Sequence, residues 1–199
     1  MATLVEIEKK LFDEFVGKHD RGYDWQTDKE SRHKYFSLFY EQAFAPYRDK
    51  EIDFLEIGAG DGLSLLIFKE YFKNCKSIQA VDPNEGFSIW QSRFNFFDYT
   101  KITYHQENAY RQEVAESLPS FDIIIEDAIH LLKTQRRVLE LYCSKIKQNG
   151  FLAIEDIYPE SNIQELIKVI PDHLSYEVVD LRKQAAEDSL LLVVRNNKG

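Results

Sequence analysis

From Ile52 onward, short apolar runs alternate with amphipathic stretches, and no other feature restricts the possible folds as strongly. Runs apolar on both faces, such as residues 121–125, are typical of buried parallel strands. The predicted strands are residues 53–57, 77–81, 102–105, 121–125 and 151–154. The predicted helices between and after them lie near residues 63–73, 86–96, 110–118, 131–147 and 160–170. Such alternation implies βαβ units with right-handed crossovers.

The two ends of the chain have different patterns. Residues 2–17 and 31–45 carry apolar side chains at helical spacing, with Pro46 just past the second segment and a predicted ordered loop, residues 18–30, between them. Residues 176–179 and 190–194 are predicted to form an antiparallel hairpin at one edge of the sheet. The sequence therefore predicts one α/β domain over residues 1–199. Its core, residues 52–199, is a Rossmann-like sheet of about seven mostly parallel strands with helices on both faces, and residues 1–48 form a helical cap.

Composition limits the possible partners. The 199 residues are enough for one domain with a substantial core. The net charge of -9 argues against a nucleic-acid or anionic-membrane partner, since both need a basic surface. No apolar run approaches the roughly 20 residues of a membrane-spanning helix. The cysteines, Cys75 and Cys143, and a start without the features of a signal peptide favour a reducing, cytoplasmic setting.

A glycine-rich loop follows the first predicted strand, in the segment Glu56-Ile57-Gly58-Ala59-Gly60-Asp61-Gly62. Glycines allow a sharp turn and let a ligand approach the backbone, and the helix predicted from Leu63 offers free N–H groups. A tight turn without a ligand is the alternative. The dinucleotide pattern G-x-G-x-x-G would need a glycine where Leu63 stands, so the loop favours another nucleotide-like cofactor.

Two further polar positions lie at strand ends. Asp82 follows the second predicted strand, where an acid can accept hydrogen bonds from two ribose hydroxyls, although Asp-Pro-Asn is also a common turn. Glu107 and Asn108 follow the third predicted strand and are candidates to contact an adenine edge, or to form a solvated loop.

Acidic residues stand where the fourth and fifth predicted strands end, namely Asp127, Glu155 and Asp156. Ligands of an open parallel sheet bind beyond the carboxyl ends of its strands, so these acids are expected at the same rim as the glycine loop. Three carboxylates there repel one another unless something positive lies between them, and oxygen ligands favour Mg²⁺, with Mn²⁺ as a substitute. Alternatively, Asp127 only caps the following helix and the other two form a solvated strand end.

His130 opens the helix that follows the fourth predicted strand, close to Asp127. A histidine can take up a proton near neutral pH, so His130 is the candidate general base and His33 the next candidate. A purely structural histidine is the alternative.

These residues together resemble class I S-adenosylmethionine-dependent O-methyltransferases. The chain is similar to the macrolide (mycinamicin-type) sugar O-methyltransferases and to cephalosporin hydroxylase-like proteins over about residues 25–160. The motifs that carry the resemblance are E-x-G-x-G-x-G from Glu56, Asp127-Ala128-Ile129-His130, Glu155-Asp156, and an upstream signature of Thr27-Asp28-Lys29, His33, Tyr35 and Tyr40. The chain departs from the family pattern at Ala128 and Ile129, which changes the expected pocket wall, and it is shorter than the macrolide enzymes.

The resemblance implies a site with defined roles. Asp127, Glu155 and Asp156 would ligate magnesium, and His130 with Asp127 would serve catalysis. Residues near the cofactor, S-adenosyl-L-methionine, would be Asp28, Lys29, Glu56, Gly58, Ala59, Gly60, Gly62, Asp82, Glu107, Asn108 and Asp127. Asp28 and Lys29 would line the entrance for cofactor and acceptor. The expected acceptor is a sugar or glycan with two adjacent hydroxyls, because a metal can grip both oxygens. A homo-oligomer and a place in a larger glycan-modifying polypeptide are further expectations.

Three other functions fit parts of the sequence. A nicotinamide-dependent oxidoreductase explains the glycine loop and Asp82 but leaves the acidic residues unused. A catechol-type methyltransferase is also metal-dependent. A non-catalytic module that binds an adenosyl ligand gains nothing from clustered carboxylates.

Overall fold

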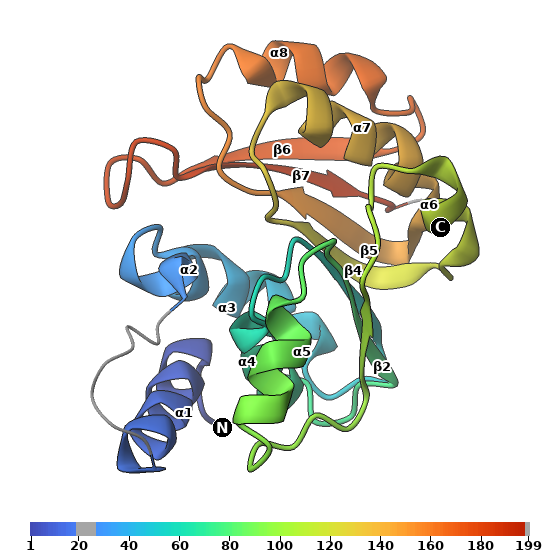
Figure 1. The fold of residues 1–199 in the computed structure, drawn as a ribbon. Coiled ribbons are helices and arrows are strands. Elements are labelled where there is room, and N and C mark those ends of the chain that lie inside the picture. Colours follow the sequence, from blue (N-terminus) through green and yellow to red (C-terminus); the bar gives the residue numbers. More distant parts are fainter. Residues whose placement is uncertain (19–26, 198–199) are drawn as a thin grey trace.

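The computed structural model of the protein describes residues 1–18 and 27–197 (Figure 1). In this part of the chain the sheet has seven strands in the order β3-β2-β1-β4-β5-β7-β6. The parallel strands are β1 (Asp53–Ile57), β2 (Ser77–Val81), β3 (Ile102–His105), β4 (Phe121–Glu126) and β5 (Ile146–Ile154). β7 (Leu190–Arg195) runs antiparallel to β5 and to the edge strand β6 (Ser175–Asp180). The predicted Rossmann-like α/β fold with a C-terminal hairpin is confirmed.

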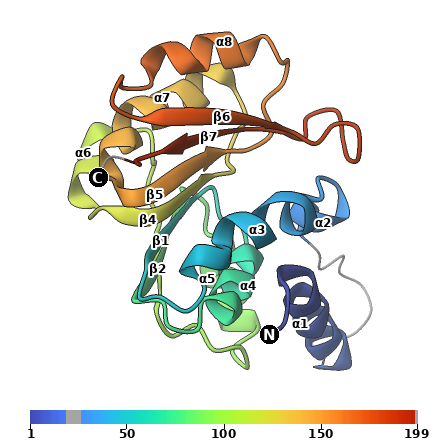
Figure 2. The same cartoon turned by 180° about the vertical axis from the view of Figure 1, so that it is seen from behind.

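Helices cover both faces of the sheet (Figures 1 and 2). One face carries α1 (Leu4–Lys18), α4 (Leu63–Tyr71) and α5 (Gly86–Arg93), and the other carries α6 (Gln112–Ser117), α7 (Leu132–Tyr142) and α8 (Asn162–Leu166). Successive side chains of a strand point to opposite faces of the sheet and pack into two separate hydrophobic cores. Ile123, for example, lies in the core of the first face and Ile124 in the core of the second. Complete burial of such a side chain stabilises the fold by about 1.5–3 kcal/mol. None of the described helices is both long and apolar enough to cross a membrane.

The N-terminal cap differs from its prediction. The single helix expected over 31–45 is wrong, because Lys34 has a φ of +58° that interrupts a helix. The segment forms α2 (Asp28–Ser31), a π-helical turn η1 (Phe36–Tyr40), α3 (Glu41–Phe44) and a 3₁₀ turn η2 (Ala45–Tyr47). Pro46 lies within the last turn, where a proline near the first helical position is tolerated. Of the loop predicted over 18–30, residues 19–26 lie outside the described residues and residues 28–30 belong to α2.

The predicted strands agree closely with the structure, and helix ends agree less well. β1, β2 and β3 have the predicted bounds, β4 extends to Glu126, and β5 begins at Ile146 rather than at Phe151. The early part of β5 is polar and irregular, since Asn149 has a φ of +61° and the register with β4 shifts there. Helices α7 and α8 end earlier than predicted and continue as 3₁₀ turns η3 (Cys143–Lys145) and η4 (Ile167–Val169).

The connection between β6 and β7 reaches back to the N-terminal cap, and both views show it beside α2 (Figures 1 and 2). Arg32 donates to the Asp188 carboxylate at 2.7 Å, and His33 Nδ1 lies 2.9 Å from Ser189 Oγ. The N-terminal cap and the β6–β7 connection therefore meet near the carboxyl ends of the central strands, which is the rim where the sequence predicted a site.

Candidate active site

The glycine loop after β1 has the conformation that its sequence predicts. Gly58, Gly60 and Gly62 have φ values of +88°, +50° and +81°, which side chains disfavour. A Cβ on Gly58 would lie 2.3 Å from the carbonyl oxygen of Asp127, whereas a Cβ on Gly60 would meet nothing within 4 Å. Gly58 thus lets the loop pack on the end of β4, and Gly60 leaves open space beside the backbone.

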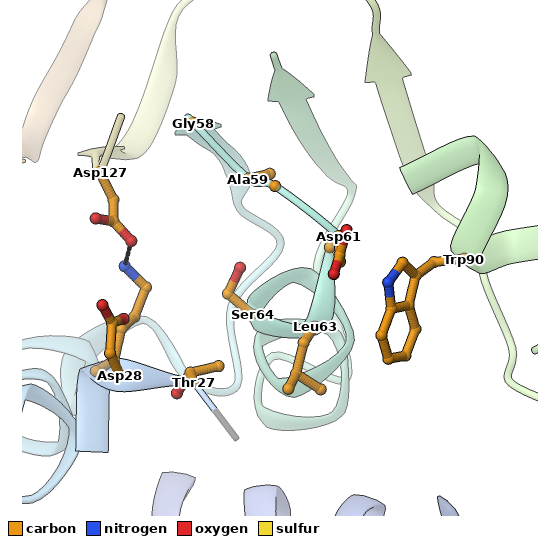
Figure 3. Close-up of a pocket in the computed structure, with 12 residues that line it drawn as sticks. Thr27, Asp28, Gly58, Ala59, Asp61, Leu63, Ser64, Trp90 and Asp127 are labelled. Atoms are coloured by element: carbon orange, nitrogen blue, oxygen red, sulfur yellow. Dashed lines mark hydrogen bonds and ion pairs between the residues drawn. The ribbon is translucent and has the colours of Figure 1, made fainter. Parts of the chain in front are cut away.

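Two cavities lie on either side of this loop. The first has a volume of about 400 Å³ and is lined by residues 27–29, 58–64, Trp90 and Asp127. The second has a volume of about 450 Å³ and is lined by residues of the β2, β3 and β4 ends, including Asp82, Asn108 and Ile129. Gly58, Gly60 and Asp127 line both cavities, so an elongated ligand can pass from one to the other across the loop. Figure 3 shows the first cavity, with the Asp127 carboxylate on one side and the Trp90 ring on the opposite side.

Asp82 is fixed against the glycine loop. Its Oδ2 accepts a hydrogen bond from the Gly60 N–H at 3.0 Å, and its Oδ1 accepts one from the Asn84 N–H at 2.8 Å. Each carboxylate oxygen can accept a further hydrogen bond, so the side chain remains able to bind hydroxyl groups in the second cavity. Asn108 lines this cavity too.

Glu107 does not join the predicted cofactor site. It is exposed and lines a separate cavity with His105 and Arg111, whereas its neighbour Asn108 faces the second cavity. After the end of β3, adjacent side chains of the turn point in different directions, and the sequence did not show which one faces inward. The assignment of Glu107 to the cofactor stays a prediction that its place in this separate cavity disfavours.

The acidic residues of the rim converge, and a lysine lies between them. Lys29 Nζ donates to Asp127 Oδ2 at 2.5 Å and to Glu155 Oε2 at 2.7 Å, and it lies 3.5 Å from Glu56 Oε1 (Figure 3, dashed line to Asp127). The side chain of Lys29 is only 2 % exposed. The positive charge that the sequence required among these carboxylates is thus present in the chain itself.

Two tyrosines of the cap complete the cluster. Tyr40 donates a hydrogen bond to Glu155 Oε1, and Tyr35 donates one to Asp156 Oδ1 at 2.6 Å. Both oxygens of Glu155 are therefore engaged by residues of the N-terminal segment. The sequence had marked Lys29, Tyr35 and Tyr40 as part of a signature, but it did not reveal that they bond these acids. The signal in the sequence that could have indicated these bonds is the presence of polar side chains within a segment rich in aromatic residues.

The charges in this cluster are shifted by burial. Burial raises the pKa of Glu56 to about 7, with Lys29 and a hydrogen bond from Ser64 Oγ acting against it. Burial also raises the pKa of Glu155 well above its usual range, again opposed by Lys29. Burial alone would lower the pKa of Lys29, but Asp127, Glu155 and Glu56 raise it well above its usual range. Lys29 therefore carries its charge, and the more deeply buried acids hold protons more tightly than free carboxyl groups do.

His130 lies on the open side of the same cluster. Its Nε2 is 3.6 Å from Asp127 Oδ1 and 3.7 Å from Asp156 Oδ2, and its side chain is 34 % exposed. The histidine can thus meet a ligand on one side and the two carboxylates on the other. His33, the other candidate base, is buried with Nδ1 against Ser189 and Asp156, so it lies behind Asp156 rather than in the open part of the site.

The predicted magnesium ligands do not face a common point as a set. Asp127, His130 and Asp156 each offer one atom within a sphere that a cation could share, but Glu155 is turned to Tyr40 and Lys29. A divalent ion bound by Asp127 and Glu155 together would have to take the place of the Lys29 ammonium. The assignment of all three acids to a metal stays a prediction that the geometry of Glu155 disfavours.

Residues 28–187 match a family described as a methyltransferase domain. The chain is 26% identical over 138 residues to 8-demethyl-8-alpha-L-rhamnosyl tetracenomycin-C 2'-O-methyltransferase of Streptomyces olivaceus, with 66% of this chain and 35% of that protein covered. It is 25% identical over 143 residues to L-olivosyl-oleandolide 3-O-methyltransferase of Streptomyces antibioticus, with 67% and 35% covered. The chain thus spans about a third of the length of these relatives.

Solved structures show the same fold. MycE methyltransferase from the mycinamycin biosynthetic pathway, in complex with Mg, SAH and mycinamycin VI, aligns with a TM-score of 0.66 and 18% identity, covering 96% of this chain and 54% of that one. An rRNA methylase from Streptococcus thermophilus aligns with a TM-score of 0.62 and 14% identity, covering 79% and 93%. At these identities the likeness establishes a Rossmann-like methyltransferase fold.

Proposed function

Because the chain belongs to the methyltransferase domain family, we propose that it transfers a methyl group from S-adenosyl-L-methionine to a hydroxyl oxygen of a sugar. One observation carries the proposal. Asp127 lines both cavities beside the glycine loop and also faces His130, so a cofactor lying across the loop would present its methyl group next to a proton acceptor.

The two cavities suit the two halves of the cofactor. The adenosine part fits the second cavity, where Asp82 would bind the ribose hydroxyls and Asn108 lies toward the base. The methionine part fits the first cavity, past Gly60 and toward Asp28. Glu56, predicted near the cofactor, lies buried beneath the loop, and its Oε1 has no hydrogen-bond partner among the described residues. It would act on the cofactor from beneath the loop rather than by direct contact.

The transfer itself needs alignment and removal of one proton. The acceptor oxygen attacks the methyl carbon in line with the sulfur, so that a C–O bond forms while the C–S bond breaks and its electron pair stays on sulfur. Holding the two reactants in this geometry lowers the barrier by removing the entropy of encounter. The hydroxyl proton passes to the His130 imidazole, and the Asp127 and Asp156 carboxylates, which face its Nε2, balance the positive charge that the imidazole gains.

Magnesium dependence stays a prediction from the sequence. The complex of MycE contains Mg, which supports it for the fold neighbour. In this chain a Mg²⁺ or Mn²⁺ ion would find Asp127, Asp156 and His130, without Glu155.

The acceptor class rests on the relatives. Their names describe methylation of rhamnosyl and olivosyl groups, which supports a sugar hydroxyl as the acceptor. We further interpret residues 1–199 as one domain that acts in the cytoplasm, where the free and buried Cys75 and Cys143 would stay reduced. Its place in a larger glycan-modifying polypeptide and its oligomeric state remain proposals.

The proposal is tested by following label from methyl-labelled S-adenosylmethionine. Four classes of acceptor are compared. The first is a rhamnoside and an olivoside with two adjacent free hydroxyls, and the second is the same glycosides with these hydroxyls already methylated. The third is a catechol and the fourth an RNA. We expect label to enter the free glycosides and not their methylated counterparts. Label in the catechol or the RNA alone would contradict the sugar assignment, and no transfer to any of the four classes would contradict the proposed function.

A further inference from the structure

A buried lysine lies between the two strand ends at which a metal was expected. We propose that Lys29 is the resident cation of the acidic rim, holding Asp127 and Glu155 together in place of a divalent ion. In this arrangement Lys29 is a positioning residue, because it fixes the Asp127 carboxylate that faces His130. The inference rests on the proposed function only for the role of Asp127.

The distances leave no room for both cations between the Asp127 and Glu155 carboxylates. Lys29 Nζ is 2.5 Å from Asp127 Oδ2 and 2.7 Å from Glu155 Oε2. A Mg²⁺ ion that bridged these two oxygens would need distances of about 2.0–2.1 Å to each of them. It would therefore lie almost on the nitrogen, and two positive charges at that separation repel each other strongly.

Lys29 is held in this position from both sides of α2. Before it, the Thr27 N–H and hydroxyl both donate to Glu8 Oε1, at 2.9 and 2.7 Å. After it, Arg32 pairs with Asp188 of the β6–β7 connection. The backbone that carries Lys29 is thus tied to α1 and to the C-terminal hairpin.

The arrangement also determines which partner each carboxylate oxygen of Asp127 and Glu155 has. Glu155 gives one oxygen to Lys29 and the other to Tyr40, so none is left for an ion. Asp127 gives Oδ2 to Lys29, and its Oδ1 faces His130 at 3.6 Å. Lys29 therefore decides which oxygen of Asp127 supports the base, and it removes Glu155 from metal binding.

The test measures Mn²⁺ binding by electron paramagnetic resonance, with S-adenosylhomocysteine present, in a cycle of four proteins. They are the wild type, Glu155→Gln, Lys29→Met and the double variant. We expect Glu155→Gln to leave the Mn²⁺ affinity of the wild type unchanged, whether that affinity is weak or undetectable. Lys29→Met should bind Mn²⁺ about tenfold more tightly or better, equivalent to about 1.4 kcal/mol, because it frees two carboxylates for the ion. The double variant should lose this gain.

Two results would overturn the inference. One is a wild type whose Mn²⁺ affinity falls about tenfold or more in Glu155→Gln, since Glu155 would then be a ligand. The other is a folded Lys29→Met protein without a Glu155-dependent gain. If Lys29→Met does not fold, the comparison of the wild type with Glu155→Gln still decides. Lys147→Met is the matched control, since Lys147 lies between Asp53 and Asp122 at the opposite edge of the same sheet, where strands β1 and β4 begin. Glu155→Gln should have no effect in that background. The readout is metal binding, so a failure of the proposed methyl transfer would be seen separately.

Discussion

His130 holds a left-handed backbone conformation, with a φ of +56°, between β4 and α7. Such a conformation costs a residue with a side chain about 1–2 kcal/mol. Asp156, which faces it, is also left-handed, with a φ of +54°. Residues with such strained backbone conformations are typical of functional sites, where the surrounding structure holds them in place. The pair places the imidazole against two carboxylates while leaving it accessible to a ligand.

A change of His130 should therefore affect the chemistry more than binding. We expect His130→Ala to lower kcat by about 10²–10⁴-fold at neutral pH, because a positioned base contributes that much to proton transfer. S-adenosylhomocysteine affinity should remain at the wild-type value, since His130 does not line either cavity beside the glycine loop. Steady-state kinetics together with calorimetry checks both parts, and a near-normal kcat would reject the assignment of the base.

At the scale of elements, lysines bridge the strands at both ends of the sheet. Lys29 from α2 joins the carboxyl ends of β4 and β5, and Lys147 in β5 joins Asp53 of β1 with Asp122 of β4 at 2.6 and 2.8 Å. Burial acts to raise the pKa of Asp53, but hydrogen bonds from Lys147 and Ser77 hold it below its usual value. Burial acts to lower the pKa of Lys147, but its two acidic partners hold it above its usual value.

Removing Lys147 should produce a pH-dependent loss of stability. We expect Lys147→Met to lower the free energy of unfolding by about 1 kcal/mol at pH 7, as for a partly exposed ion pair. The depressed pKa of Asp53 stabilises the fold above pH 3.8, and this contribution is lost as the pH falls through the folded-state value. The raised pKa of Lys147 stabilises the fold below pH 10.5, and this contribution is lost as the pH rises through its folded-state value. The gap between wild type and variant in urea unfolding should thus be constant between these limits and shrink beyond both, and a gap that does not change with pH would contradict the ion pairs.

The elements show which parts of the fold a sequence can predict. The predicted bounds of strands β1 to β3 agree with the structure, because a short apolar run with a polar turn on each side leaves little choice of where the strand begins and ends. The cap did not match, because a backbone reversal at Lys34 has no signature in the residue types around it. In the site, Asp82 and Asp127 were located correctly, since parallel strands bring their carboxyl ends to one rim. The pairing of Lys29 with Asp127 and Glu155 depends on how a distant segment packs on that rim, which no local pattern contains.

At the scale of the whole molecule, both ends of the chain are tied to the sheet that they flank. Phe15 of α1 packs against Trp90 and Phe94 of α5, with ring centroids 6.0 and 5.0 Å apart. We expect residues 1–199 to unfold in urea as one cooperative unit, with superimposable transitions by circular dichroism and by tryptophan fluorescence. Transitions separated along the urea axis would show that the cap and the core are independent.

The central claim is that the glycine loop and Asp82 form a binding site for S-adenosylmethionine, and the binding of S-adenosylhomocysteine by calorimetry tests it most directly. The account predicts binding to the wild type, no binding of NAD⁺, and an affinity about 10–100-fold lower for Asp82→Ala, because a hydrogen bond to a charged group contributes about 1.5–3 kcal/mol. A folded wild type that does not bind S-adenosylhomocysteine, or an Asp82→Ala protein that binds it as tightly, would contradict the account.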